Sequence, residues 1–191
     1  DEATVLNYVN KKLPPFAPRD SAVPVTDTAD PGTPPATVIE ELPAAQGKLT
    51  IGMRIGIDSA GVDYPAFALF NEVYGGAPSS KLFTVIREKM SLCYYCSTGG
   101  DRYKNVLFVT SGIENENFEK ARDGILAQLK EIADGNINDD EIAAAKKSLI
   151  SNYRSIGDSG YALASWYLMR SVTGDLFTPE DMICRINALT K

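Results

Sequence analysis

The stretch LTIGMRIGI, residues 49–57, alternates apolar side chains with polar or small ones without a break. Successive side chains of a β-strand point to opposite faces, so this pattern predicts a strand with one buried, apolar face and one face of small or polar residues. Residues 92–99 and 105–113 are two further runs rich in aromatic and β-branched residues. The short connection between them predicts a pair of neighbouring strands.

Elsewhere apolar residues recur at helical spacing, which is typical of helices with one buried face. The helices predicted in this way cover residues 1–13, 64–75, 79–90, 117–135, 138–153, 159–174 and 178–189. Asn138 with Glu141 makes a capping-box pattern, and Thr178 precedes Pro179 in a first turn. The order of strand, two helices, strand pair and then helices predicts an α+β fold. We expect a two-layer sandwich in which an antiparallel or mixed sheet carries helices on one face.

Residues 14–47 hold eight of the 11 prolines in the chain. Proline fixes φ and removes a backbone donor, so this segment is predicted to be an extended, irregular linker. We therefore expect residues 1–13 to be the last helix of a preceding domain and residues 48–191 to be a C-terminal domain. Three strands are few beneath so many helices, so the sheet is expected to be one strand short or to have an open edge.

Composition excludes several functions. The net charge of −6 argues against nucleic acid as a partner, although an acidic surface would accept basic peptides. No apolar run approaches the ~20 residues that a membrane helix needs, so we expect no membrane partner. Three cysteines are too few for a dense framework of disulfide bonds, which favours a reducing compartment, the cytoplasm. The chain has no histidine, which excludes histidine-based catalysis and any zinc site that needs histidine from this chain.

Cys93 and Cys96 form a C-x-x-C spacing, which in other proteins marks redox dithiols and zinc sites. In a regular strand, residues three apart point to opposite faces, so these thiols are expected not to share a metal or a disulfide. A redox pair usually lies at a helix start, whereas here a predicted helix ends just before it. Packing is therefore the favoured role, with redox and metal roles as the alternatives.

The surrounding string GGAPSSKLFTVIREKMSLCYYCST, residues 75–98, resembles the second-domain signature of the pitrilysin-type zinc metallopeptidases, the family of insulin-degrading enzyme and mitochondrial processing peptidase. The matching positions are Gly75, Gly76, Ser79, Ser80, Lys81, Leu82, Phe83, Arg87, Glu88, Lys89, Leu92 and Tyr94. The downstream segment 111–149 also resembles the strand, long helix and following helix of that family. The resemblance covers about residues 48–191 and implies the half-domain fold of LuxS and processing-peptidase-like metallohydrolases.

The resemblance also implies a role. Family members bind zinc through H-x-x-E-H in the first domain, and this chain lacks that motif. It therefore implies a peptidase-like, inactive C-terminal domain, with no cofactor in this chain and zinc held by the preceding homologous domain or a homologous partner subunit, as in a dimer. Arg87 and Tyr94 are the candidate residues that contact the peptide substrate, because both can donate hydrogen bonds to a developing oxyanion.

Both residues also have plain structural interpretations. Arg87 could satisfy carbonyls at a helix end, and Tyr94 could be an ordinary strand aromatic. The alternative function is accordingly a purely structural or protein-binding module with no role in proteolysis. Because family domains usually continue through another helix and a final strand, we also expect that residues 48–191 are a truncated domain.

Overall fold

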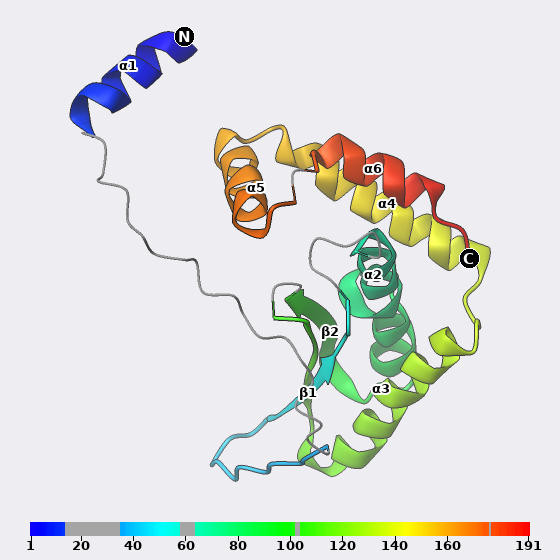
Figure 1. Cartoon of the computed structure of the whole chain (residues 1–191). Helices are drawn as coiled ribbons and strands as arrows, with labels where there is room; N and C mark the ends of the chain where they lie inside the picture. Colours follow the sequence, from blue (N-terminus) through cyan, green and yellow to red (C-terminus); the bar gives the residue numbers. More distant parts are fainter. Residues whose placement is uncertain (14–34, 58–63, 102–103, 176) are drawn as a thin grey trace.

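The computed structural model describes residues 1–13, 35–57, 64–101, 104–175 and 177–191. Most of the predicted linker, residues 14–34, and residues 102–103 of the predicted connection between the last two strands lie outside the described residues. The elements are α1 (Glu2–Lys12), β1 (Gly47–Arg54), α2 (Tyr64–Asn71), η1 (Glu72–Gly76), η2 (Leu82–Lys89), β2 (Cys93–Asp101), β3 (Val106–Ile113), η3 (Asn115–Asn117), α3 (Phe118–Ala133), α4 (Asp139–Ile156), α5 (Gly160–Thr173) and α6 (Pro179–Ala188). Figure 1 shows their arrangement. The predicted α+β class is confirmed.

The described strands form one antiparallel sheet in the order β1-β3-β2, with β3 in the centre. Leu49, Ile51 and Met53 of β1 point toward the core, as the alternating pattern predicts. Among the described residues, β1 and β2 each have a neighbouring strand on one side only. The expected open edge is therefore present.

The helix predicted over 64–75 changes its winding halfway. The α-helical part α2 ends at Asn71, and the wider π-type turn η1 follows. A Cβ on Gly75 would lie 2.6 Å from the Thr98 methyl group, so glycine at this position lets η1 approach β2 closely. The next predicted helix, η2, is also π-type. These wider turns cannot be read from an apolar spacing that fits both kinds of helix.

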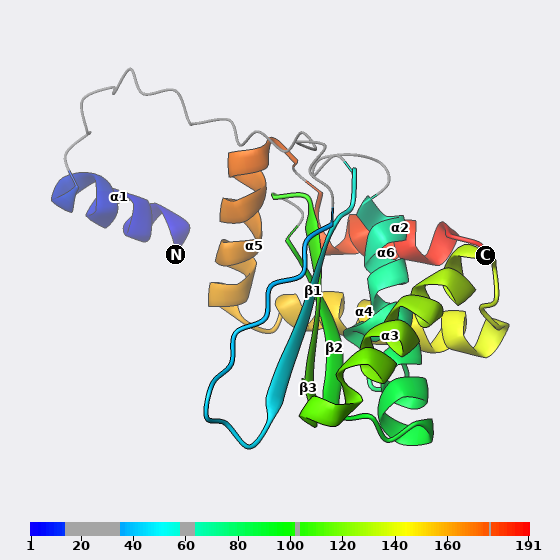
Figure 2. The ribbon, with the colours of Figure 1, turned by 90° about the horizontal axis from the view of Figure 1, so that it is seen from below.

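Two hydrophobic cores hold the domain together. The first lies between the sheet and the segments η1, η2 and α3, with Leu82, Ile86 and Ile125 fully buried. The second lies among α2, η1, α4 and α6, with Met182 and Ile186 fully buried. α5 stands apart from α2 and α3, on the other side of the strands in Figure 2. It lies near the end of β2, where its side chains line a hollow.

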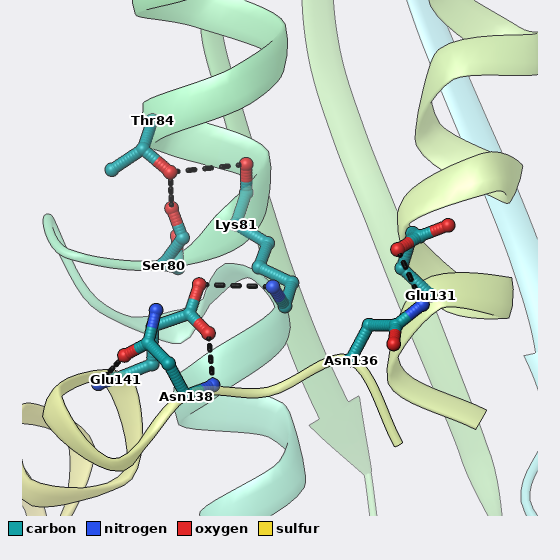
Figure 3. Close-up of polar contacts among 7 residues, drawn as sticks. All are labelled: Ser80, Lys81, Thr84, Glu131, Asn136, Asn138 and Glu141. Atoms are coloured by element: carbon teal, nitrogen blue, oxygen red, sulfur yellow. Dashed lines mark hydrogen bonds and ion pairs between the residues drawn. The ribbon is translucent and has the colours of Figure 1, made fainter. Parts of the chain in front are cut away.

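Polar contacts connect η2 to the start of α4 (Figure 3). Lys81 Nζ lies 2.9 Å from Glu141 Oε1, and both side chains are largely buried. Glu141 also completes the predicted capping box: its backbone N–H donates to the Asn138 side chain, and its carboxylate accepts from the Asn138 N–H. Thr178 caps α6 with Pro179 in the first turn, as predicted. Local cap chemistry therefore sets both helix starts.

The predicted helix over residues 1–13 forms as α1, and none of its residues is buried. Its origin in a preceding domain stays a prediction. Among the helices of the described residues, none combines the length and the apolar character needed to cross a membrane.

Candidate functional site

The candidate site centres on a β-bulge at the start of β2. Cys93 pairs with Ile113 of β3, and Tyr95 pairs with the next residue along, Gly112, so Tyr94 is an extra residue without a partner in the register. An extra residue bends the strand and redirects side chains, and such bulges are over-represented next to functional sites. Here Tyr94 and Tyr95 are both exposed, Tyr94 to 59%.

Arg87, near the end of η2, reaches this bulge. Its Nε donates a hydrogen bond to the Tyr94 carbonyl oxygen at 3.0 Å. Its Nη1 lies 3.1 Å from Glu88 Oε1, and its guanidinium carbon lies 4.6 Å from the Phe83 ring centroid. Arg87 thus bonds to the carbonyl of the bulged strand residue, and it remains partly exposed. The structure brings the two predicted site residues together through this bond.

Glu114 is a third member of the site that sequence reasoning missed. The Tyr94 phenol donates to Glu114 Oε1 at 3.3 Å, and the other carboxylate oxygen of Glu114 accepts from Asn117 at 3.5 Å. Glu114 follows β3 directly, and antiparallel pairing places the end of β3 beside the start of β2. Antiparallel pairing of the two predicted strands could therefore have identified it.

The site combines a guanidinium, a phenol and two carboxylates on an exposed surface. Arg87 and Tyr94 can donate hydrogen bonds to a carbonyl oxygen or an oxyanion. The Tyr94 bond to Glu114 is long and exposed, so another acceptor, such as a carbonyl oxygen, could replace Glu114 at small cost. Glu88 and Glu114 place two negative charges beside the single positive charge of Arg87, which disfavours a strong anion at this surface.

The geometric argument about the two cysteines was wrong. The extra residue in the bulge turns Cys93 toward the same face as Cys96, opposite Ile113 and Ser111 of β3, and both are free thiols. Burial raises the pKa of both thiols, that of Cys96 to about 12 with a further contribution from Cys93. Cys96 belongs to the first core and Cys93 packs against it, so the expected packing role agrees with the structure.

These residues do not fit a zinc ion. A structural zinc site needs four ligands, and Cys93 and Cys96 supply only two. Cys184, the remaining thiol, is exposed on α6. In the part of the chain that the structure describes, no three His, Cys, Asp or Glu side chains gather where they could hold a metal ion.

Comparison with known proteins agrees with this architecture. The family model described as "Peptidase M16 inactive domain" matches residues 1–149, and the chain belongs to this family. This confirms the resemblance to the second domain of pitrilysin-type peptidases. The chain is a non-catalytic, peptidase-like domain.

Individual relatives are similar over limited parts of their length. A curated Bacillus subtilis (strain 168) protein named "Probable inactive metalloprotease YmfF" is 36% identical over 163 residues, which cover 85% of this chain and 38% of that protein. A solved conserved protein from Enterococcus faecalis V583 is 30% identical with a TM-score of 0.80, over 100% of this chain and 45% of that one. A solved peptidase M16 inactive domain from Pseudomonas fluorescens, 22% identical with a TM-score of 0.67, covers 78% of this chain and 36% of that one and supports the fold alone. The chain thus spans less than half the length of these relatives.

Proposed function

We propose that this domain completes a peptide-binding chamber whose zinc is carried by another domain or by a homologous partner subunit with an H-x-x-E-H motif. Arg87 and Tyr94 then face the peptide near the bond that is cut. The partners in this proposal are the preceding homologous domain, the zinc-bearing subunit and the peptide, in the cytoplasm, without nucleic acid or membrane.

One observation carries the proposal: the bulge at Tyr94 presents an exposed phenol at the place where Arg87 bonds to the same residue. An ordinary strand tyrosine would need neither the extra residue nor the arginine. A phenol and a guanidinium placed at a developing oxyanion stabilise it, and loss of one such donor lowers the rate by about 10²–10³-fold.

A second function, that of a purely structural or protein-binding module, is favoured by another observation. Arg87 contacts Glu88 and Phe83, and Tyr94 contacts Glu114, so both side chains have structural partners in this domain. In that case the two residues stabilise the bulge and η2, and peptide hydrolysis does not depend on them.

The test begins with the full protein purified at native levels from its own cells, together with whatever co-purifies. Mass spectrometry identifies a partner with H-x-x-E-H, and metal analysis measures zinc per complex. The decisive variant is Tyr94→Phe, because it removes only the hydroxyl group and leaves the Arg87 bond to the backbone in place. Tyr161→Phe, at an exposed tyrosine of α5, is the matched control.

We expect stoichiometric zinc, a peptide-cleaving complex, and a drop in kcat/KM of at least tenfold for Tyr94→Phe with no change for Tyr161→Phe. A complex without zinc, or a Tyr94→Phe complex as active as the unmodified one, would support the structural module instead.

A further inference from the structure

The end of β2 opposite the bulge borders two adjoining hollows. The inner one has a volume of about 160 Å³ and lies among α2, η1, α4 and Gly100 of β2. The outer one, of about 570 Å³, lies between α5 and the end of β2. Both have Tyr64 and Gly100 in their walls, so they adjoin. The inner hollow alone is roughly ten times the ~10–15 Å³ that one water needs.

Glu72 places a carboxylate in the inner hollow. The residue is only 7% exposed, and among the described residues no hydrogen bond or ion pair reaches its side chain. Buried carboxylates are normally paired, because removing an unpaired charge from water is costly. A Cβ on Gly76 would come within 2.8 Å of Glu72 Oε2, so the glycine leaves room for this carboxylate.

A second acceptor in the same wall also has no partner. Asn71 lines the inner hollow, and its buried Oδ1 accepts no hydrogen bond within the described part of the chain. Three aromatic side chains, those of Tyr64, Phe67 and Tyr153, also line the hollow. Aromatic faces attract cations and also pack against an aliphatic stem.

The charged groups in the wall of the outer hollow have partners of their own. Asp101 lines it, while the guanidinium of Arg170 is paired with the buried Asp175 and lies over the Trp166 ring, 3.7 Å from its centroid. The positive charge in the wall is thus neutralised by its own partner. Asp101 is likewise paired, with Lys104 Nζ 3.8 Å from its Oδ2, so Glu72 is the carboxylate that an entering group would meet.

We propose that the two hollows form a receptor for a basic side chain, the ammonium or guanidinium group of a lysine or arginine in an extended peptide. The charged group binds Glu72 and Asn71 Oδ1, and its stem packs against the aromatic walls. The inference rests on the proposed peptide-binding function, which it deepens. Gly100 lies six positions after Tyr94 in β2, about 20 Å along an extended strand. The basic residue would therefore lie about six positions from the residue at Tyr94.

The test uses two tryptophan-free peptides that differ only in lysine or its uncharged analogue norleucine, with calorimetry as the measure of affinity. Trp166 is the only tryptophan of the chain and lines the outer hollow, so its fluorescence reports whether binding occurs there. N-acetyl-lysine methylamide and its norleucine counterpart probe the hollow without a peptide chain. We expect the lysine ligands to bind at least tenfold more tightly and to change the Trp166 fluorescence.

Two variants with matched controls locate the effect. Glu72→Gln keeps the size of the side chain and should remove the preference for lysine, whereas Glu119→Gln, at an exposed position of α3, should keep it. Ala68→Leu fills the inner hollow and should weaken the lysine ligands at least tenfold, whereas Ala66→Leu, exposed on the same helix, should not.

Equal affinities for lysine and norleucine, or a preference that survives Glu72→Gln, would overturn the inference. If the small probe binds this chain but not the full protein, a basic group of the remaining protein occupies the hollow, and the peptide receptor is likewise refuted. The proposed function is judged separately by Tyr94→Phe. Loss of the lysine preference in Glu72→Gln with no effect of Tyr94→Phe would retain the receptor and reject the substrate role of the bulge.

Discussion

The ion pair between Lys81 and Glu141 joins the start of η2 to the start of α4, and its strength can be measured directly. Lys81 Nζ and Glu141 Oε1 are 2.9 Å apart, and the side chains are only 11% and 22% exposed. Exposed ion pairs contribute about 0.2–1 kcal/mol, whereas an unpaired charge left in a buried place costs several times more. Glu141→Gln keeps a side chain that can complete the capping box but leaves Lys81 without its counter-charge.

We expect Glu141→Gln to lower the free energy of unfolding by about 1–3 kcal/mol, the cost of a buried polar group that loses its partner. Lys81→Met keeps most of the apolar stem and should cost about 1–2 kcal/mol by the same reasoning. The double variant should cost little more than the larger single change, which gives a coupling energy of about 1–2 kcal/mol.

The assay is urea unfolding of the four proteins followed by circular dichroism, at low salt and at 0.5 M NaCl. The control cycle uses Lys130 of α3 and Asp134, the C-cap of that helix, whose 2.6 Å ion pair is shorter but has side chains 75% and 47% exposed. Its coupling should be about 0.3–0.5 kcal/mol and should fade at high salt. A Lys81–Glu141 coupling no larger than the control, or equally sensitive to salt, would refute the argument that burial makes this pair strong.

Three further outcomes follow from burial. Iodoacetamide at pH 8 should modify the exposed Cys184 first and Cys93 more slowly, while Cys96 should react only on unfolding; rapid native labelling of Cys96 by mass spectrometry would contradict this. Burial raises the pKa of Tyr74 above its ordinary value and that of Cys96 to about 12, and the unfolded chain loses both protons at lower pH. The contribution of these two groups to the free energy of unfolding should therefore be fully present below about pH 9 and should fall as the pH rises toward 12. The urea midpoint should fall over the same range, and Cys96→Ala should make that fall smaller. Met182→Ala empties a fully buried position in the second core and should cost about 2–5 kcal/mol in urea unfolding, and a loss below 1 kcal/mol would mean that α6 does not pack as described.

The fold was predictable to a large extent because its signals are local. The alternation in residues 49–57 marks β1, and the pairs Asn138–Glu141 and Thr178–Pro179 mark helix starts that the structure places at those residues. A cap depends on atoms a few residues apart, so the sequence contains all the partners. The π-type winding of η1 and η2 was not predictable, because it depends on how closely the chain packs against β2.

The candidate site was likewise predictable only in part from the sequence. The spacing of Arg87 and Tyr94 within a family-like string was visible in the sequence, and the family assignment agrees with it. Their mutual bond and the contact with Glu114 depend on where β3 ends beside β2. Their role toward a peptide stays a prediction.

By itself, the sequence determined the α+β class, most helix limits and the absence of histidine chemistry, because these follow from composition and from contacts within a few residues. Only the tertiary structure decided which face Cys93 occupies, since one extra residue in β2 reverses the alternation and is revealed only by the register against β3. It alone also showed that the Glu72 carboxylate lines a hollow enclosed by α2, α4 and β2. The physical reason is that strand register and enclosed space arise from segments far apart in the chain, and no local pattern encodes them.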